Sequence, residues 1–470
     1  MINAKEVHRR MDQAEKKIPE TATGKYRHKY HLMPPTGWLN DPNGLSYYGG
    51  NYHVFFQYAP ENARGGDKCW GHYQSPDLLN WEYTGIAIYP DTEYDRNGAY
   101  SGGALTDDGN LELFYTGNLK EEGDFDYINE GRGATVIYLS TEDGVHLTEK
   151  ELLMTNDDYP ADLSRHVRDP KVWKEGGRYY MVQGARTKED KGVVLVFSSE
   201  DKYHWNYIHR LESEEKFGFM WECPDLYELD GQTILCISPQ GVEQDGYWYA
   251  NKYQTVTSVI HGDFRTDGVP EGFRELDGGF DFYAPQTFLT EDGRRILIGW
   301  MGMADVEDEY TNRTTEDGWQ NVLTLARELS LKDGIVCQNP VRELSSWWNE
   351  EVSFEGQYTG NTDICYELNL KNTEKKWEVL IAGGLKLSWS PEEYVFRMEF
   401  TDGKLGCGRG LRAREIKACK DIRIVVDASC VEVFMNGGKD VFSTRFYPEK
   451  DQYTVKASGE GLTGSYRYRV

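Results

Sequence analysis

Short runs of apolar and aromatic residues, separated by polar turns, recur along most of the chain. They are rich in β-branched and aromatic residues, a composition typical of strands. The five clearest are YHVFFQY from residue 52, LELFYTG from 111, RYYMVQG from 178, TILCIS from 233 and RILIGWM from 295. A helical period is nearly absent beyond residues 2–20, which read as one amphipathic helix. The pattern predicts an all-β protein with a short N-terminal helix.

A glycine-containing turn stands directly before each of these five strands. The turn glycines recur at intervals of roughly sixty residues and are Gly50, Gly109, Gly177, Gly231 and Gly293. A second repeat has a similar spacing, namely SPDLLNW from 75, STEDGVHL from 140 and SSEDKYHW from 198. A four-stranded sheet with its loops fits this period, so we expect a five-bladed β-propeller.

The sixty-residue period ends near residue 330. We expect an N-terminal helix and lead-in at 1–24, a propeller catalytic domain at 25–335, a connector at 336–350 and a β-sandwich domain at 351–470. Within the last part, the stretch IRIVVDASCVEVFMNGGKDVFSTRFY from 422 predicts a three-stranded meander with an NGG turn.

Composition narrows the classes of function. The net charge of −26 argues against nucleic acid and anionic membranes as partners. The 32 Tyr, 13 Trp and 18 Phe suit both a β core and a sugar site. Eight scattered cysteines without zinc-like spacing, and a charged N-terminus without an apolar signal segment, lead us to expect a cytoplasmic protein with reduced thiols and no metal.

Polar residues occupy the same place in each repeat, eight to twelve residues before the turn glycine. They are Asp41, Ser101, Asp169, Glu222 and, in the fifth unit, Asp281 and Tyr283. In a propeller these strand starts converge on one end of the central channel. Two facing carboxylates are the minimum equipment for glycoside hydrolysis, one as nucleophile and one as acid/base. Taken alone, the motifs of Asp41 and Asp169 read as ordinary turns, and Glu222-Cys223 carries almost no signal, but their shared phase favours an active site.

The motifs resemble those of glycoside hydrolase family 32. They are WLNDPNG at 38–44, FQYAP at 56–60, WGH at 70–72, YSG at 100–102, RDPKVW at 168–173, WECPDL at 221–226 and DFYAPQ at 281–286. The resemblance spans the whole expected propeller. It implies a five-bladed propeller followed by a β-sandwich, the activity of a retaining β-fructofuranosidase, and no cofactor.

The resemblance also implies the roles of individual residues. Asp41 would be the nucleophile, Glu222 the general acid and base, and Asp169 the residue that holds two fructose hydroxyls. Arg168 would orient a carboxylate beside them. The sugar would be bound by Asn40, Gln57 and Ser101, and walled by Trp38, Tyr100 and Trp300; Tyr283 joins the binding residues through its place in the repeat.

One position departs from the family pattern. Gly65 stands about where members commonly carry another tryptophan, so we expect a more open rim there. We expect His72, His166 and Cys223 to be structural, and the GCGRG stretch from 406 to belong to a hairpin of the sandwich.

Several readings of the function stay open. We expect hydrolysis of sucrose or sucrose 6-phosphate, and the charged N-terminus favours an imported substrate, as in bacterial sucrose-6-phosphate hydrolases. The alternatives are an intracellular exo-hydrolase of fructo-oligosaccharides, a propeller glycosidase acting on pentosides, and a non-catalytic sugar-binding propeller. An oligomer is possible, and no phosphate-binding residue can be assigned.

Overall fold

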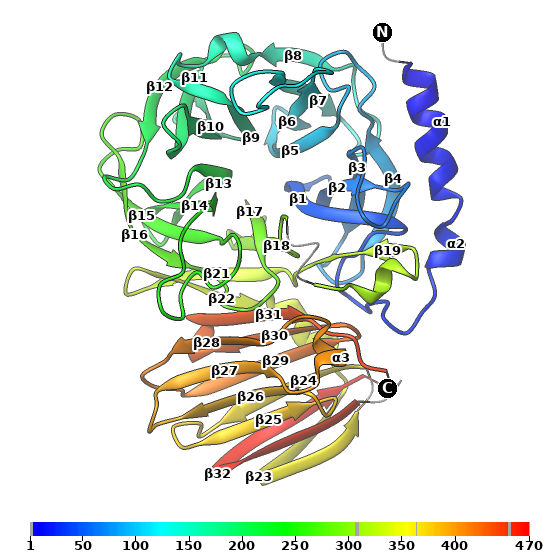
Figure 1. Cartoon of the computed structure of the whole chain (residues 1–470), viewed down its shortest axis with the longest axis vertical. Coiled ribbons are helices and arrows are strands. Elements are labelled where there is room, and N and C mark those ends of the chain that lie inside the picture. Colours follow the sequence, from blue (N-terminus) through cyan, green and yellow to red (C-terminus); the bar gives the residue numbers. More distant parts are fainter. Residues whose placement is uncertain (1–2, 306–309, 363, 450–452, 470) are drawn as a thin grey trace.

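A ring of five small sheets and a separate two-layered β unit make up the computed structural model (Figure 1). The structure describes residues 3–305, 310–362, 364–449 and 453–469. The expected five-bladed propeller and the C-terminal sandwich are confirmed. None of the described helices is long and apolar enough to cross a membrane.

The N-terminal segment forms two helices, α1 (Ala4–Glu15) and α2 (Ile18–Thr21), where the sequence predicted one. The expected N-terminal helix is confirmed as α1, and α2 is a separate single turn because the ring of Pro19 would clash with the carbonyl of Glu15 in a continuous helix. Helix α1 lies against the outer edge of the first blade (Figure 1), where Tyr89 donates a hydrogen bond of 2.6 Å to Asp12.

Each blade is an antiparallel sheet with its first strand on the central channel. The first blade consists of β1 (Gly37–Tyr48), β2 (Asn51–Ala59), β3 (Cys69–Ser75) and β4 (Glu82–Ile88), and the second of β5 (Ala99–Asp107), β6 (Asn110–Lys120), β7 (Arg132–Thr141) and β8 (Glu151–Met154). The third consists of β9 (Leu163–Glu175), β10 (Arg178–Thr187), β11 (Gly192–Ser199) and β12 (Asn206–Leu211), and the fourth of β13 (Met220–Leu229), β14 (Gln232–Gln240), β15 (Val256–His261) and β16 (Val269–Glu275). The fifth consists of β17 (Tyr283–Leu289), β18 (Arg295–Met301), β21 (Arg327–Lys332) and β22 (Ile335–Pro340). The short β20 (Val322–Leu323) pairs with β18, and β19 (Trp319–Gln320) pairs in parallel with β1, which joins the end of the propeller to its first blade.

Every inner strand carries a two-residue bulge at the same place. The register shifts enclose Asn40–Asp41 on β1, Tyr100–Ser101 on β5, Asp169–Pro170 on β9, Cys223–Pro224 on β13 and Ala284–Pro285 on β17. Four of these bulges lie directly before or contain a proline, which cannot donate to the strand ladder and therefore suits a bulge. Asp41, Ser101 and Asp169 lie within these bulges, whereas Glu222 and Tyr283 lie directly before theirs.

In the second sequence repeat, an aspartate side chain accepts hydrogen bonds from the backbone of its own turn. The carboxylate of Asp77 accepts hydrogen bonds from the backbone N–H groups of Leu79 (3.0 Å) and Asn80 (2.8 Å). Asp143 and Asp201 bind the equivalent N–H groups in the second and third blades. These turns join the third and fourth strands of their blades, so their role is structural.

The C-terminal unit folds one continuous sheet into two layers. Its strands are β23 (Glu350–Thr362), β24 (Cys365–Lys371), β25 (Trp377–Ile381), β26 (Leu385–Ser390), β27 (Val395–Phe400), β28 (Leu411–Glu415), β29 (Asp421–Asp427), β30 (Cys430–Met435), β31 (Asp440–Arg445) and β32 (Tyr453–Tyr468). The first half of β32 pairs with β25 and its second half with β24, so β32 passes from one layer to the other. The predicted meander is confirmed as β29–β30–β31.

Short helical turns complete the description. They are η1 (Asn156–Asp158), η2 (Arg313–Thr315), η3 (Arg342–Ser346), η4 (Asn436–Gly438) and α3 (Gly403–Gly406). The GCGRG stretch connects β27 and β28, which pair antiparallel, so its assignment to a hairpin is confirmed. The domain boundary expected at 335 stays a prediction; β22 of the fifth blade ends at Pro340.

A buried ion-pair cluster joins the propeller to the sandwich. Asp281 accepts hydrogen bonds from the guanidinium groups of Arg409 (2.8 and 2.9 Å) and Arg445 (3.1 and 2.9 Å). The expectation that Asp281 would face the channel with the other repeat residues is wrong. Its two arginine partners come from the sandwich, and a buried carboxylate is stable only where such cations compensate it.

Candidate active site

The bulges gather three carboxylates at one end of the channel. Asp41 lies on β1, Asp169 on β9 and Glu222 on β13. Cys223 links the three, since it directly follows Glu222 and its Sγ lies 3.6 Å from both Asp41 Oδ2 and Asp169 Oδ2. The juxtaposition expected from the repeat is therefore present.

Asp41 is surrounded by hydrogen-bond donors. Asn40 Nδ2 donates to Oδ1 (3.0 Å), while Gln57 Nε2 (3.2 Å) and Ser101 Oγ (2.5 Å) donate to Oδ2. Burial raises the pKa of Asp41, the hydrogen bonds from Ser101 and Asn40 lower it, and the charge of Glu222 raises it. Donors that favour the ionised form prepare a buried carboxylate for nucleophilic attack.

Asp169 is held by backbone contacts on both sides. Its N–H donates to Thr116 Oγ1 (2.8 Å), and its Oδ2 accepts from the N–H of Cys223 (2.9 Å). Its φ of +66° is unusual for a residue other than glycine, and this backbone conformation sets the direction of the side chain at the bulge. Burial raises the pKa of Asp169 to about 7; the Arg168 cation opposes the rise, and the negative Glu222 and Asp41 increase it.

Glu222 has donors on both carboxylate oxygens. Arg168 donates to Oε1 through Nε (3.1 Å) and Nη2 (2.6 Å), and Gln240 Nε2 donates to Oε2 (2.8 Å). Tyr283 Oη lies 2.6 Å from the same Oε2. The four contacts fix the orientation of Glu222 relative to the channel.

Tyr283 can form a hydrogen bond with Glu222 in either protonation state of that carboxyl group. The phenol has one proton and two acceptors within reach, Glu222 Oε2 at 2.6 Å and the carbonyl of Ser238 at 3.1 Å. If Glu222 is ionised, Tyr283 donates its hydrogen bond to Glu222 and not to the carbonyl of Ser238. If Glu222 is protonated, it donates to Tyr283, which then donates to Ser238. Both protonation states of Glu222 therefore have a consistent hydrogen-bond arrangement.

Aromatic rings line the site beside Asp41. Trp38 donates from Nε1 to Asn40 Oδ1 (2.8 Å) and packs edge-on against Trp300 at 6.0 Å. Tyr283 also packs edge-on against Trp300, at 6.4 Å. Tyr100 lies in the bulge beside Ser101 and is partly exposed. The aromatic residues predicted from the sequence thus stand around the carboxylates, while their binding roles stay predictions.

The more open rim expected near Gly65 stays a prediction. Gly65 has a φ of +98°, which L side chains rarely adopt, and its Cα faces Trp38. Lys68 Nζ lies 4.8 Å from the centre of the Trp38 ring, a cation–π arrangement. A lysine rather than a second tryptophan therefore covers Trp38 here.

Sequence reasoning missed one partner of Glu222 and one partner of Arg168. Gln240 lies on the second strand of its blade, outside the repeat position, and binds Glu222. His166 was expected to be structural, yet its Nδ1 accepts from Arg168 Nη1 (2.9 Å) and its Nε2 donates to the carbonyl of Tyr127 (3.1 Å). Burial, and then the nearby positive charges, lower the pKa of His166 to about 3, so it is a neutral acceptor for Arg168.

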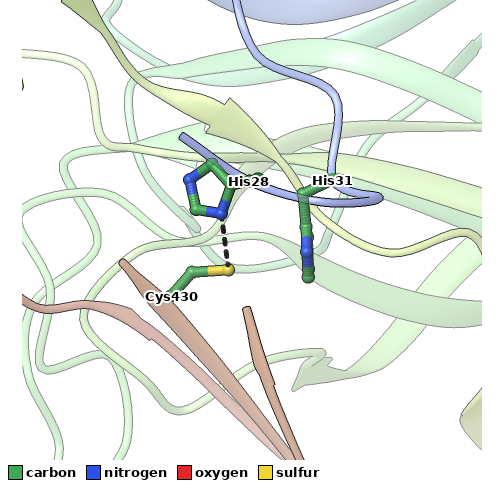
Figure 2. Close-up of side chains that lie close together, drawn as sticks. All are labelled: His28, His31 and Cys430. Carbon is green, nitrogen blue, oxygen red and sulfur yellow. Dashed lines mark hydrogen bonds between the residues drawn. The ribbon is translucent and has the colours of Figure 1, made fainter. Parts of the chain in front are cut away.

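A second cluster of potential metal ligands lies away from the carboxylates. Figure 2 shows His28, His31 and Cys430 close together between the N-terminal segment and the sandwich. The nitrogens of His31 bind Asp427 Oδ2 (2.9 Å) and Glu432 Oε1 (2.8 Å), and His28 Nδ1 binds the Asp427 carbonyl (2.8 Å). These contacts occupy the nitrogens a metal would need.

The charge of His31 explains this arrangement. Burial alone would lower the pKa of His31, but Cys430, Asp427 and Glu432 together raise it well above its ordinary value. An imidazolium between two carboxylates is a buried ion-pair bridge, not a metal site.

Comparison with known proteins agrees with the geometry. The family model for the glycosyl hydrolases family 32 N-terminal domain matches residues 31–340, and that for the family 32 C-terminal domain matches residues 405–467. The chain is 37% identical to a sucrose-6-phosphate hydrolase of Bacillus subtilis, over 96% of this chain and 95% of that one. It is 36% identical to a raffinose invertase of Escherichia coli, with 90% of each covered.

Solved structures show the same similarity. A Bombyx mori family 32 β-fructofuranosidase, a mutant in complex with sucrose, superposes with a TM-score of 0.87 at 33% identity, over 100% of this chain and 98% of that one. A sucrose-6-phosphate hydrolase of Lactobacillus gasseri superposes with a TM-score of 0.89 at 28% identity, over 98% and 96%. The chain therefore belongs to glycoside hydrolase family 32 and is a glycosidase.

Proposed function

We propose that the enzyme hydrolyses the terminal β-D-fructofuranosyl bond of sucrose or sucrose 6-phosphate with retention of configuration. The observation that carries this is the pairing of Asp41, held by three oxygen and nitrogen donors, with Glu222, whose oxygens contact both a cation and a phenol. Sucrose and its phosphate are named for similar proteins with more than 90% of their length aligned.

In the first step Asp41 attacks the anomeric carbon of the fructosyl unit and forms a covalent ester. Glu222 gives its proton to the oxygen of the leaving sugar, so no alkoxide has to depart. Loss of that proton leaves a carboxylate whose charge Arg168 and Tyr283 stabilise at 2.6 Å each. The network around Glu222 thus serves both of its protonation states.

In the second step Glu222 takes a proton from a water molecule, whose oxygen attacks the anomeric carbon and displaces the carboxylate of Asp41. Asp169 would hold two hydroxyls of the sugar ring while positive charge develops on it. Its fixed position, between Thr116 and Cys223, suits a residue that binds more strongly in the transition state.

The finer assignments are also proposals. The chain divides at about residues 24, 335 and 350, and it works in the cytoplasm on an imported substrate. All eight cysteines are free and seven are buried, which suits a reducing compartment. Exo-hydrolysis of fructo-oligosaccharides is the alternative within the same chemistry, because the Gly65 rim lacks a tryptophan.

Glu222→Gln tests the proposal against a non-catalytic sugar-binding protein. We expect turnover of sucrose and of sucrose 6-phosphate to fall by about 100-fold or more, while binding of fructose, measured by calorimetry, persists. Glu228→Gln is the matched control, because Glu228 lies on the same strand and is exposed. Unchanged turnover in Glu222→Gln would refute the mechanism, and release of arabinose or xylose with no action on fructosides would favour a pentosidase.

A further inference from the structure

Three arginines lie near the neutral His166. Arg168 contacts its Nδ1 directly, and the charges of Arg132 and Arg186 both act on the imidazole. Arg132 is the first residue of β7, and Arg186 is close to the end of β10. Each of these three cations would be stabilised by a neighbouring anion.

Two of the three arginines have carboxylate partners. Arg168 is paired with Glu222, and Arg186 donates through Nε (2.9 Å) and Nη2 (2.6 Å) to Asp190. Arg132 differs: its Nη2 contacts the amide oxygen of Asn118 at 3.3 Å, and no ion pair of Arg132 is found in the described part of the chain.

The fold holds Arg132 at the site rather than in solvent. The loop 121–131, which leads into Arg132, is tied to β9 by two hydrogen bonds: the N–H of Arg165 donates to the Ile128 carbonyl (2.8 Å), and His166 donates to the Tyr127 carbonyl (3.1 Å). Arg132 is partly buried, and its charge acts on Arg168, Tyr100, Glu222 and Asp169. Burial lowers its pKa, and the like charge of Arg168 lowers it further. A partly buried guanidinium without an anion is unfavourable.

We propose that Arg132 binds an anionic group on the leaving sugar, a phosphate monoester, and so selects phosphorylated over plain disaccharides. This rests on the proposed function and adds to it the residue that determines specificity. The guanidinium fork matches two phosphate oxygens, and a phosphate carries the charge that Arg132 lacks. Arg168 keeps its contacts with Glu222 and His166 in this arrangement, so binding the phosphate at Arg132 does not require Arg168 to leave Glu222.

The test is the ratio of kcat/KM for sucrose 6-phosphate to that for sucrose. We expect Arg132→Gln to lower this ratio by about 30-fold or more, because one partner of a partly buried charge pair is removed. Arg165→Gln is the matched control, an exposed arginine on the same rim, and should leave the ratio unchanged. Lys68→Gln tests the rival cation above Trp38. Calorimetric binding of glucose 6-phosphate against glucose gives a second measurement that needs no turnover.

The outcomes separate this proposal from the proposed function. A ratio that falls in Arg132→Gln alone, with weaker binding of glucose 6-phosphate, supports it. An unchanged ratio, a ratio that falls only in Lys68→Gln, or equal loss on both sugars overturns it while leaving fructoside hydrolysis intact. If neither sugar is hydrolysed by the unmodified enzyme, the proposed function fails, and the calorimetric comparison still decides whether Arg132 binds phosphate.

Discussion

At the scale of single residues, the site contains three carboxylates, and it is unfavourable for all three to be ionised at once. Asp41, Asp169 and Glu222 share one partly desolvated space, with one close cation, Arg168. Burial and mutual repulsion raise the pKa of Asp41 and of Asp169. Carboxylates whose surroundings separate their pKa values can serve as acid and nucleophile at the same pH.

Asp169 should make stability depend on pH. Its pKa is about 7 in the folded chain against 3.8 as the ordinary value, so between those pH values the folded state binds more protons than the unfolded state. The free energy of unfolding therefore falls as pH rises through this window, by at most about 1.4 kcal/mol per pH unit. Asp169→Asn removes the effect and should be more stable, relative to the unmodified enzyme, at about pH 8 than at about pH 5.

Urea unfolding of both proteins at the two pH values checks this. Asp124→Asn, a change on the exposed loop 121–131, is the control and should show no such difference. A gap between Asp169→Asn and the unmodified enzyme that is the same at both pH values would contradict the shifted pKa.

Much of the site could be predicted because its residues repeat in phase with the turns. Asp41, Asp169 and Glu222 were found in this way, and their convergence is confirmed. Asp281 was placed wrongly because its partners Arg409 and Arg445 are more than a hundred residues away and belong to another domain. The repeat period gives no information on such contacts, or on the role of Gln240, which lies on the second strand of its blade.

At the scale of elements, the site depends on how the inner strands are interrupted. Each has a bulge at the same place, and Asp169, Cys223 and Ala284 have positive φ values of 66°, 46° and 47° within them. The sequence at four of the bulges contains Asp-Pro, Cys-Pro or Ala-Pro, and Asp-Pro alone is also common in ordinary turns. What the sequence could not show is that each of the five inner strands is interrupted by a bulge.

The hairpin turns give a prediction about backbone conformation. Gly231 has a φ of +79° with open space around its Cα, so Gly231→Ala should cost about 1 kcal/mol of unfolding free energy through backbone strain alone. Gly410 also faces open space but has an ordinary φ, so Gly410→Ala should be neutral or slightly stabilising. Thermal unfolding of the two variants tests this, and equal shifts in Tm would argue against the turn conformation.

At the scale of the whole molecule, the propeller and sandwich are joined by buried charge. Asp281 with Arg409 and Arg445, and Arg327 with Asp277 and Glu432, form pairs that are almost wholly shielded from solvent. Since Glu432 also binds His31, the N-terminal segment is held by the same network. The sequence predicted both domains but not this contact, because it depends on how the two surfaces meet.

Asp281→Asn should therefore destabilise the enzyme strongly. Two buried guanidinium groups would lose their shared anion, at a cost of about 3–5 kcal/mol. Asp292→Asn, which removes a half-exposed partner of Arg294, should cost less than about 1 kcal/mol. Denaturant unfolding compares them, and equally small effects of both changes would show that the interface charges contribute little.

The central claim is that Asp41 carries a fructosyl group during turnover. The most direct measurement is mass spectrometry of peptides from Glu222→Gln quenched while it reacts with an aryl β-fructofuranoside, whose leaving group needs no acid. The account predicts one hexosyl adduct on the peptide that contains Asp41, and no adduct after Asp41→Asn. Fructose release without any adduct, or an adduct on Asp169, would contradict it.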